Sequence, residues 1–321
     1  MLARHAEDLF WTGRYLERAE DTARLLDVTY HGLLESPLAD ADATWRELLE
    51  VLHLSESFAA SGAPLGAAGV SEFLVLNSQN PGSIVAAVTR ARENARAVRE
   101  RISTELWEAI NGLYLELRAR DLRADLARQP YQLYTLVRNR CQMVSGVAAE
   151  TMSRDDGWRF LLLGRMLERV EMTCRLLTVR FAPAHERPIP PDVHEWIRVL
   201  KSVSAFEAYL KSYRAEIEPH DVLEFLLLSR DFPRSVLFGL RAAERELARL
   251  GGGAAASRPE RLLGRLRAEL EFLDVQELLD RGLQSSLDAL QDSIHGVADT
   301  VAAHFFRSGA TRPELHAFEA L

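Results

Sequence analysis

A stretch of 16 residues occurs twice in this 321-residue chain, and it constrains the fold more than any other feature. Residues 13–28 read GRYLERAEDTARLLDV, and residues 164–179, 151 positions later, read GRMLERVEMTCRLLTV. Eleven of the 16 aligned positions are identical, and five of those identical residues are charged. A repeat at a fixed offset indicates a fold built from two similar halves.

The repeat extends well beyond this stretch, because further landmarks recur in the same order with nearly the same spacing. Trp45 recurs as Trp196, Pro81 as Pro233 and Gly146 as Gly296. We therefore predict a tandem duplication, with copy 1 over residues 1–152, copy 2 over 153–308, and a C-terminal tail over 309–321. Each copy is expected to be a bundle of about five helices, and the two copies to pack around a pseudo-two-fold axis with the repeat helices central.

Nearly every segment has the 3.6-residue hydrophobic period of a helix, which predicts an all-α fold. Proline- and glycine-rich segments separate the periodic stretches. In copy 1 the predicted helices cover 2–35, 42–61, 70–77, 84–120 (with a kink near Ser103 or Gly112) and 131–152. In copy 2 they cover 155–181, 192–213, 221–229, 235–250, 259–273 and 283–306, with 183–191 as a linker.

Composition narrows the class of protein. The formal net charge is −8, with 27% charged and 47% apolar residues, and neither half carries a basic patch, so nucleic-acid binding is not expected. No apolar run approaches the roughly 18 residues of a membrane span, and the N-terminus lacks the apolar core of a signal peptide. The only cysteines, Cys141 and Cys174, fit a reducing compartment. We expect a soluble cytoplasmic protein without membrane association.

The repeated helix carries an unusual number of charges. On a helical wheel Arg14, Glu17 and Arg18 lie opposite an apolar face, but in the second copy that opposite side also holds leucine, methionine and valine. A helix that is apolar nearly all round is usually buried, and buried ions are costly unless they are paired. The local spacing offers four ion pairs, Arg14/Glu17, Glu20/Arg24, Arg165/Glu168 and Glu171/Arg175.

Three interpretations of these charges stay open. They could form an ion-pair network that holds the two copies in register. They could line a polar cleft in which arginines bind a carboxylate or phosphate. They could also bind metal, since Glu17/Glu20 and Glu168/Glu171 have the i, i+3 spacing of bundle metal sites. Such sites use a histidine at the second position, however, and the adjacent arginines would repel a cation, so we predict no metal ligand set.

A second charged run, from Ala91 to Arg101, has the spacing of an exposed i, i+4 ladder. No phosphate-binding loop, dinucleotide-binding glycine motif or hydrolase motif is present in the sequence, so no cofactor is predicted. The candidate residues for ligand binding or a buried ion network are Arg14, Glu17, Arg18, Glu20, Arg24, Arg165, Glu168, Arg169, Glu171, Arg175, Arg92, Glu93, Asn94 and Arg96.

The paired Leu16-Glu17-Arg18 and Leu167-Glu168-Arg169 segments resemble the bacterial alpha-E family, a helical domain named for its Glu-Arg motif. The resemblance covers essentially the whole chain. Further segments that resemble family blocks are Asn80-Pro81, Ala91–Arg96, Ile102-Ser103, Glu105, Trp107-Glu108, Asn111, Ser153–Phe160 and Pro233–Phe238. A family block at 91–96 suggests a packed or functional helix there rather than a freely solvated one.

The resemblance implies no settled activity. It does imply partner proteins. Alpha-E proteins are encoded beside, or fused to, a circularly permuted ATP-grasp protein, often near a transglutaminase-like protein and a proteasome-like peptidase. We therefore expect an accessory partner of an ATP-grasp ligase in peptide synthesis, modification or tagging. The alternatives are an enzyme with a carboxylate-bound metal and a purely structural scaffold. The sequence leaves the catalytic status and the oligomeric state open.

Overall fold

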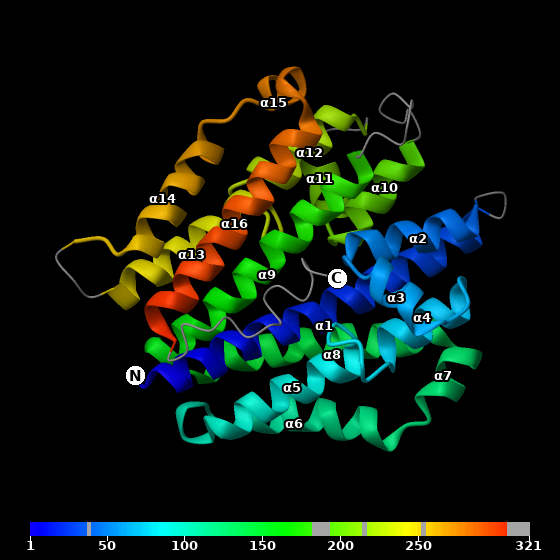
Figure 1. Ribbon diagram of the computed structural model, residues 1–321, viewed down its shortest axis with the longest axis horizontal. Coiled ribbons are helices and arrows are strands. Elements are labelled where there is room, and N and C mark those ends of the chain that lie inside the picture. The colour runs from blue at the N-terminus through cyan, green and yellow to red at the C-terminus, as the bar shows by residue number, and fades with distance from the viewer. Residues whose placement is uncertain (37–39, 182–192, 214–216, 252–254, 307–321) are drawn as a thin grey trace. The chain divides into compact units, whose positions relative to one another are not determined.

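The computed structural model describes residues 1–36, 40–181, 193–213, 217–251 and 255–306 (Figure 1). All regular secondary structure in these residues is helical, so the predicted all-α fold class is confirmed. Within the same residues, no helix has both the length and the apolar content needed to cross a bilayer.

The chain forms two compact units, which are described separately. Of the described residues, the first unit holds Met1–Arg165 together with Phe305 and Phe306, and the second holds Met166–His304. Helix α9 (Asp156–Phe181) contributes residues to both units. The division predicted between residues 152 and 153 follows the sequence repeat rather than these units and stays a prediction. The predicted linker 183–191 and tail 309–321 lie outside the described residues.

The first unit is organised around a long N-terminal helix. Its helices are α1 (Ala3–Glu35), α2 (Ala41–Val51), α3 (Ser55–Ser61), α4 (Ala67–Val75), α5 (Ile84–Ala97), α6 (Thr104–Ala119), α7 (Leu122–Arg128) and α8 (Pro130–Thr151). Helix α1 packs against α5 and α8, and α6 packs against both of these in turn. Every residue from Ala6 to Leu26 is buried, so α1 lacks the exposed face of an ordinary surface helix.

The second unit repeats this order of elements around the later part of α9. Its other helices are α10 (Val193–Ser202), α11 (Phe206–Ser212), α12 (Pro219–Leu228), α13 (Val236–Gly251), α14 (Arg258–Glu271), α15 (Val275–Arg281) and α16 (Leu283–Phe305). Gly239 brings α13 close to α9, because a Cβ there would lie 2.3 Å from Cγ2 of Val170. The Gln291 side chain of α16 donates a hydrogen bond of 2.6 Å to Oγ1 of Thr178 on α9.

The helices predicted over 42–61 and 192–213 are each broken in two. The first breaks at His53, where φ is 54°, and the second at Ser204, where φ is 53°. At the first break the N–H of Leu54 donates to the carbonyl of Leu49, a helix-ending pattern that usually has glycine at its left-handed position. Because neither break contains glycine or proline, the sequence did not show where these helices end.

The helix predicted over 84–120 is likewise two helices, α5 and α6, which lie against each other. Ser103 starts α6 by accepting a hydrogen bond of 3.1 Å from the N–H of Leu106. The short helices α7 and α15 were not predicted. With these breaks, the described residues hold eight α-helices in each half of the chain, α1–α8 and α9–α16, and the prediction of about five per copy is wrong.

Local geometry recurs along with the helix order. The break at Ser204 repeats the one at His53, since the N–H of Ala205 donates to the carbonyl of Leu200. Ser83 and Ser235 begin α5 and α13 with equal caps, each accepting a hydrogen bond of 3.2 Å from the N–H three residues on. These recurrences support the internal duplication, which stays a prediction, as does the pairing of the copies around a pseudo-two-fold axis.

Candidate functional site

Helices α1 and α9 cross in the first unit with almost no space between their backbones. A Cβ on Gly13 would lie 2.1 Å from the carbonyl oxygen of Leu161, and a Cβ on Gly164 would lie 2.0 Å from that of Phe10. Both separations are far shorter than any real contact. Gly13 and Gly164 occupy the same position of the repeat, and so do Phe10 and Leu161, so the crossing is reciprocal.

This close approach brings an arginine of α9 into contact with a glutamate of α1. Nε of Arg165 donates a hydrogen bond of 2.8 Å to Oε2 of Glu17, although 148 residues separate the two in sequence. The Glu17 side chain is 1% exposed and that of Arg165 25% exposed. The pair therefore lies at the edge of the protein interior, with its carboxylate inside.

The charged side chains in the central turns of α1 are buried. Six charged residues in its central turns are each at most 7% exposed; they are Arg14, Glu17, Arg18, Glu20, Asp21 and Arg24. Together with Arg165 these residues are called the α1 network below. Ions at this depth are tolerated only where pairing and hydrogen bonds replace water, as the arginine partners of Glu17 and Glu20 do.

The pairs predicted from local spacing are present at Glu20/Arg24 and at Glu171/Arg175, where the separation is 3.7 Å. Glu20 also accepts a hydrogen bond of 3.2 Å from Nε2 of Gln142 on α8. Sequence reasoning missed Gln142, because only the packing of α8 on α1 brings it near.

Arginines of the α1 network also stack on aromatic rings. The guanidinium carbon of Arg14 lies 5.2 Å from the centroid of the Phe10 ring, and that of Arg18 lies 5.8 Å from the Tyr15 ring. Arg90 of α5 lies 5.7 Å from the same Tyr15 ring. Such cation–π contacts are strongest where water is excluded. The α1 network is thus built into the aromatic core.

In the second unit the repeat residues of α9 hold the turn that leads into α13. Nη1 of Arg169 donates a hydrogen bond of 3.2 Å to the carbonyl of Pro233, and Oγ1 of Thr173 donates one of 3.1 Å to that of Arg234. Arg169, Glu171 and the equally buried Glu168 are each at most 6% exposed. These contacts serve the architecture of the unit.

The run 92–96 divides between packed and solvated residues. Nε of Arg92 donates a hydrogen bond of 3.0 Å to Oδ1 of Asn111 on α6, and its guanidinium lies 4.7 Å from the Tyr114 ring. Asn94 is buried. Arg96, whose side chain is 65% exposed, pairs with Glu93 at 3.1 Å. The run is therefore neither the fully exposed ladder that its spacing predicts nor a wholly packed helix.

The open space beside the α1–α9 crossing in the first unit is small. It measures about 30 Å³ and is lined by residues that include Gly13, Leu16, Trp158 and Arg165. One or two water molecules would fill that volume, whereas pockets for small-molecule ligands measure about 300–1,000 Å³. At this crossing the geometry favours a packed interface over a ligand cleft.

The two cysteines are both buried and free. Burial raises the pKa of the Cys141 thiol well above its usual value and does the same for the pKa of Cys174. A thiol must ionise to act as a nucleophile, so neither cysteine is predisposed to react.

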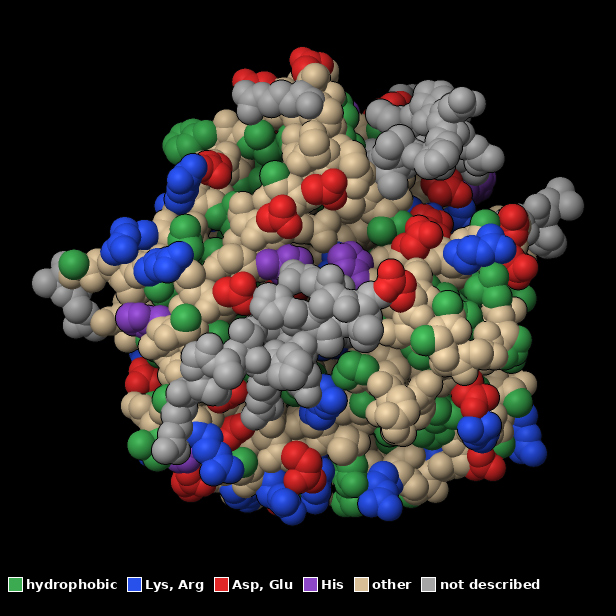
Figure 2. Space-filling view, in the orientation of Figure 1, with side chains coloured by type: hydrophobic (Ala, Val, Ile, Leu, Met, Phe, Trp, Pro, Cys, Tyr) green, Lys and Arg blue, Asp and Glu red, His purple; other side chains and the backbone are tan. Residues whose placement is uncertain are grey.

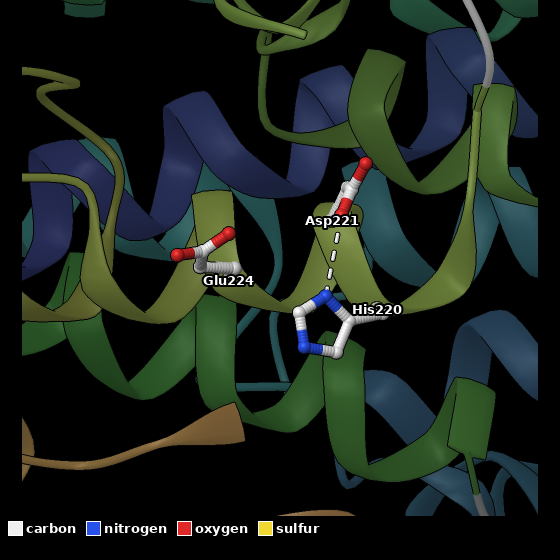
Figure 3. Close-up of side chains that lie close together, drawn as sticks. All are labelled: His220, Asp221 and Glu224. Carbon is white, nitrogen blue, oxygen red and sulfur yellow. Dashed lines mark hydrogen bonds and ion pairs between the residues drawn. The ribbon is translucent and has the colours of Figure 1, made fainter. Parts of the chain in front are cut away.

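A cluster outside the predicted site lies at the start of α12 (Figure 3). One ligand atom from each of His220, Asp221 and Glu224 lies within 4.8 Å of the others, and all three side chains are half-buried. Nδ1 of His220 is 3.2 Å from Oδ1 of Asp221, and the Tyr213 hydroxyl donates a hydrogen bond of 2.9 Å to Glu224. Imidazole with carboxylates is a donor set that suits a divalent transition metal.

This chain belongs to the Alpha-E family, described as a predicted alpha-helical domain with a conserved ER motif, and the match covers residues 1–306. It is 28% identical to the uncharacterized protein Rv2567 of Mycobacterium tuberculosis and 29% identical to the uncharacterized protein Mb2597 of Mycobacterium bovis. Each match covers 92% of this chain but only 36% of the relative. No solved structure matches.

Proposed function

We propose that this chain is an accessory partner of a circularly permuted ATP-grasp ligase in bacterial peptide synthesis, modification or tagging. In this proposal the α1 network stabilises the fold and does not bind substrate. The observation that carries the structural part is the 2.8 Å contact between Arg165 and Glu17, in which a carboxylate that is 1% exposed is neutralised by an arginine from another helix.

The same contact argues against the ligand cleft. An arginine that bound a carboxylate or phosphate ligand would need its guanidinium donors directed at open space. Arg165 instead donates to Glu17, and the space beside it measures about 30 Å³. The paired glutamates are also a poor site for a cation, since Glu17 and Glu20 each have an arginine against them.

The partner is proposed from the resemblance to the alpha-E family. Its association with ATP-grasp proteins, and with a transglutaminase-like protein as a further partner, is what the family resemblance implies. The relatives support a joint function in one respect, because more than half of each lies outside the matched part and could supply a fused partner domain. A cytoplasmic location is part of the proposal.

The direct test is co-purification of this chain with a circularly permuted ATP-grasp protein, followed by ATP hydrolysis in the presence of candidate peptides. We expect a stable complex in which hydrolysis depends on both proteins and on a peptide. Failure of the wild-type chain to bind the ATP-grasp protein, or hydrolysis that is unchanged by adding the chain, would refute the proposed function.

The cluster at His220 favours a second candidate, a metal enzyme, at residues other than those the sequence suggested. Metal analysis of the purified chain separates the two candidates. Stoichiometric iron or manganese that is lost in His220→Ala would favour the enzyme. Metal content that is substoichiometric, or equal in wild type and His220→Ala, would refute a metal site at this cluster and with it the second candidate.

A further inference from the structure

A hollow lined mainly by hydrophobic side chains lies in the second unit, where α14, α15 and α16 meet. Its volume is about 380 Å³, and its lining includes Leu266, Leu270, Leu287 and Leu290. Figure 2 shows hydrophobic side chains gathered in this hollow between α14 and α16. The volume is sufficient for a few apolar side chains, and no residue of the α1 network lines it.

Phe272 lies at the edge of the hollow and is 87% exposed. It follows the last residue of α14, where its backbone N–H closes the helix by donating to the carbonyl of Ala268. A phenylalanine side chain left in water forgoes the gain from burial, and an exposed apolar side chain next to an apolar hollow is typical of an interaction surface. The hollow and Phe272 are called the α14–α16 groove below.

The segments that form the groove carry an excess of acidic residues, of which Glu269 and Glu277 line the hollow; these residues are called its acidic rim. Residues 269–292 contain seven acidic residues and one arginine. Glu269 and Glu271 have arginine partners, at 2.7 and 3.0 Å. The exposed Asp274, Asp280 and Asp288 accept hydrogen bonds from amide groups of Gln276 and Gln284, and these neutral donors leave the carboxylate charge in place.

An apolar groove with an acidic rim fits a particular kind of partner. An amphipathic helix presents apolar side chains every three or four residues, which suits a groove, and basic residues beside that apolar face would meet the acidic rim. We propose that the α14–α16 groove binds a basic amphipathic helix of the partner protein. This inference rests on the proposed function, since the helix belongs to the separate partner chain.

The groove is tested on the full chain with a fluorescein-labelled synthetic helix of leucine and lysine as the probe. A scrambled peptide of the same composition is the control for non-specific attraction. We expect the amphipathic peptide to bind and the scrambled peptide not to. Phe272→Asp should weaken binding on the order of ten-fold, because aromatic side chains are typically among those whose loss weakens an interface most.

A charge variant and a surface control make the test specific. Glu277→Lys should weaken binding several-fold at low salt, and high salt should reduce the difference, because exposed charges are screened. The matched controls are Leu115→Asp on α6, which is 53% exposed, and Glu50→Lys on α2, which is also exposed. Both should bind the probe like the wild type. Equal binding of the two peptides, or wild-type binding by Phe272→Asp, would overturn the groove proposal.

Two further measurements separate the possible outcomes. If wild type and Phe272→Asp bind the ATP-grasp protein equally, the groove proposal fails and the proposed function stands. If wild type does not bind the ATP-grasp protein at all, the proposed function fails even where the peptide binds. Sedimentation velocity tests whether a second copy of this chain fills the groove instead. A wild-type dimer that Phe272→Asp converts to a monomer would show this, and it would also overturn the proposal.

Discussion

Gly13 of α1 and Gly164 of α9 lie at one helix crossing, where each faces a main-chain carbonyl of the other helix. A Cβ at either position would stand 2.1 or 2.0 Å from that oxygen. Because the clash is with backbone, no side-chain rotation can relieve it. The two glycines are equivalent in the repeat, so the same residue type meets the same requirement on both sides of the crossing.

Gly13→Ala should therefore force the helices apart and destabilise the protein by more than 2 kcal/mol, of the order of other overpacking defects of about 1–3 kcal/mol or larger. Gly164→Ala should do the same. Gly112 of α6 is the matched control, since a Cβ there meets nothing within 4 Å. Gly112→Ala should stabilise the protein by about 0.5–1 kcal/mol, the usual gain from replacing a helical glycine. Urea unfolding of the three variants measures these changes in the free energy of unfolding. A Gly13→Ala variant as stable as the wild type would contradict the close crossing.

Glu20 pairs with Arg24 and accepts a hydrogen bond from Gln142, with all but 1% of its surface buried. Glu20→Gln should leave Arg24 without its full countercharge and lower the free energy of unfolding by about 3–5 kcal/mol. The matched control is Glu269→Gln, which removes the carboxylate of an exposed pair with Arg265. Exposed pairs contribute little, so its urea midpoint should stay close to that of the wild type. Similar losses in the two variants would show that burial of the α1 network has been overestimated.

Tyr134 links stability to pH at the alkaline end. Its ring is fully buried, its hydroxyl donates a hydrogen bond of 2.8 Å to Oγ of Ser71, and burial raises its pKa to about 12. An unfolded tyrosine ionises near pH 10, so between about pH 10 and 12 the native state holds a proton that the unfolded state has lost. Stability should therefore fall with rising pH in this window, by about 2–3 kcal/mol in total from this residue.

Tyr134→Phe removes the group that titrates, and the fall in stability between pH 10 and 12 should become smaller by that amount. Tyr131→Phe, at a position that is 41% exposed on the same helix, is the control and should keep the wild-type slope. The measurement is urea unfolding at a series of pH values. An unchanged slope in Tyr134→Phe would mean that the buried hydroxyl ionises without cost.

The caps at Ser83 and Ser235 test whether equivalent positions of the repeat contribute equally. Each serine accepts a hydrogen bond at the start of its helix, so Ser83→Ala and Ser235→Ala should each cost about 1 kcal/mol. The threonine variants should recover most of the loss, since threonine also caps helices. A loss confined to one of the two alanine variants would show that the two halves do not share their local energetics.

The all-helical fold and the burial of α1 could be predicted from the sequence, because the hydrophobic period runs along each helix and the repeat is visible when two segments are compared directly. The ends of α2 and α10 could not. Their left-handed positions are held by His53 and Ser204, where glycine would have marked the break. Histidine and serine do not mark a left-handed position in a sequence as glycine does.

The same limit applies to the site. The pairs Glu20/Arg24 and Glu171/Arg175 follow from i, i+4 spacing within one helix. The contact of Glu17 with Arg165 spans 148 residues and depends on the glycine crossing, so spacing alone could not identify it. Arg92 is a similar case, because its stacking on Tyr114 requires the reversal of the chain between α5 and α6.

The central claim is that the charges of the repeat helices stabilise the fold through specific contacts between helices. A double-mutant cycle on Glu17 and Arg165 tests it most directly, with Glu17→Gln, Arg165→Met and the double variant compared by urea unfolding. We predict a coupling energy of at least about 1.5 kcal/mol, within the range of 0.5–3 kcal/mol seen for residues in contact. A coupling energy near zero, with each single variant as stable as the wild type, would contradict the claim and return the α1 network to the role of a ligand site.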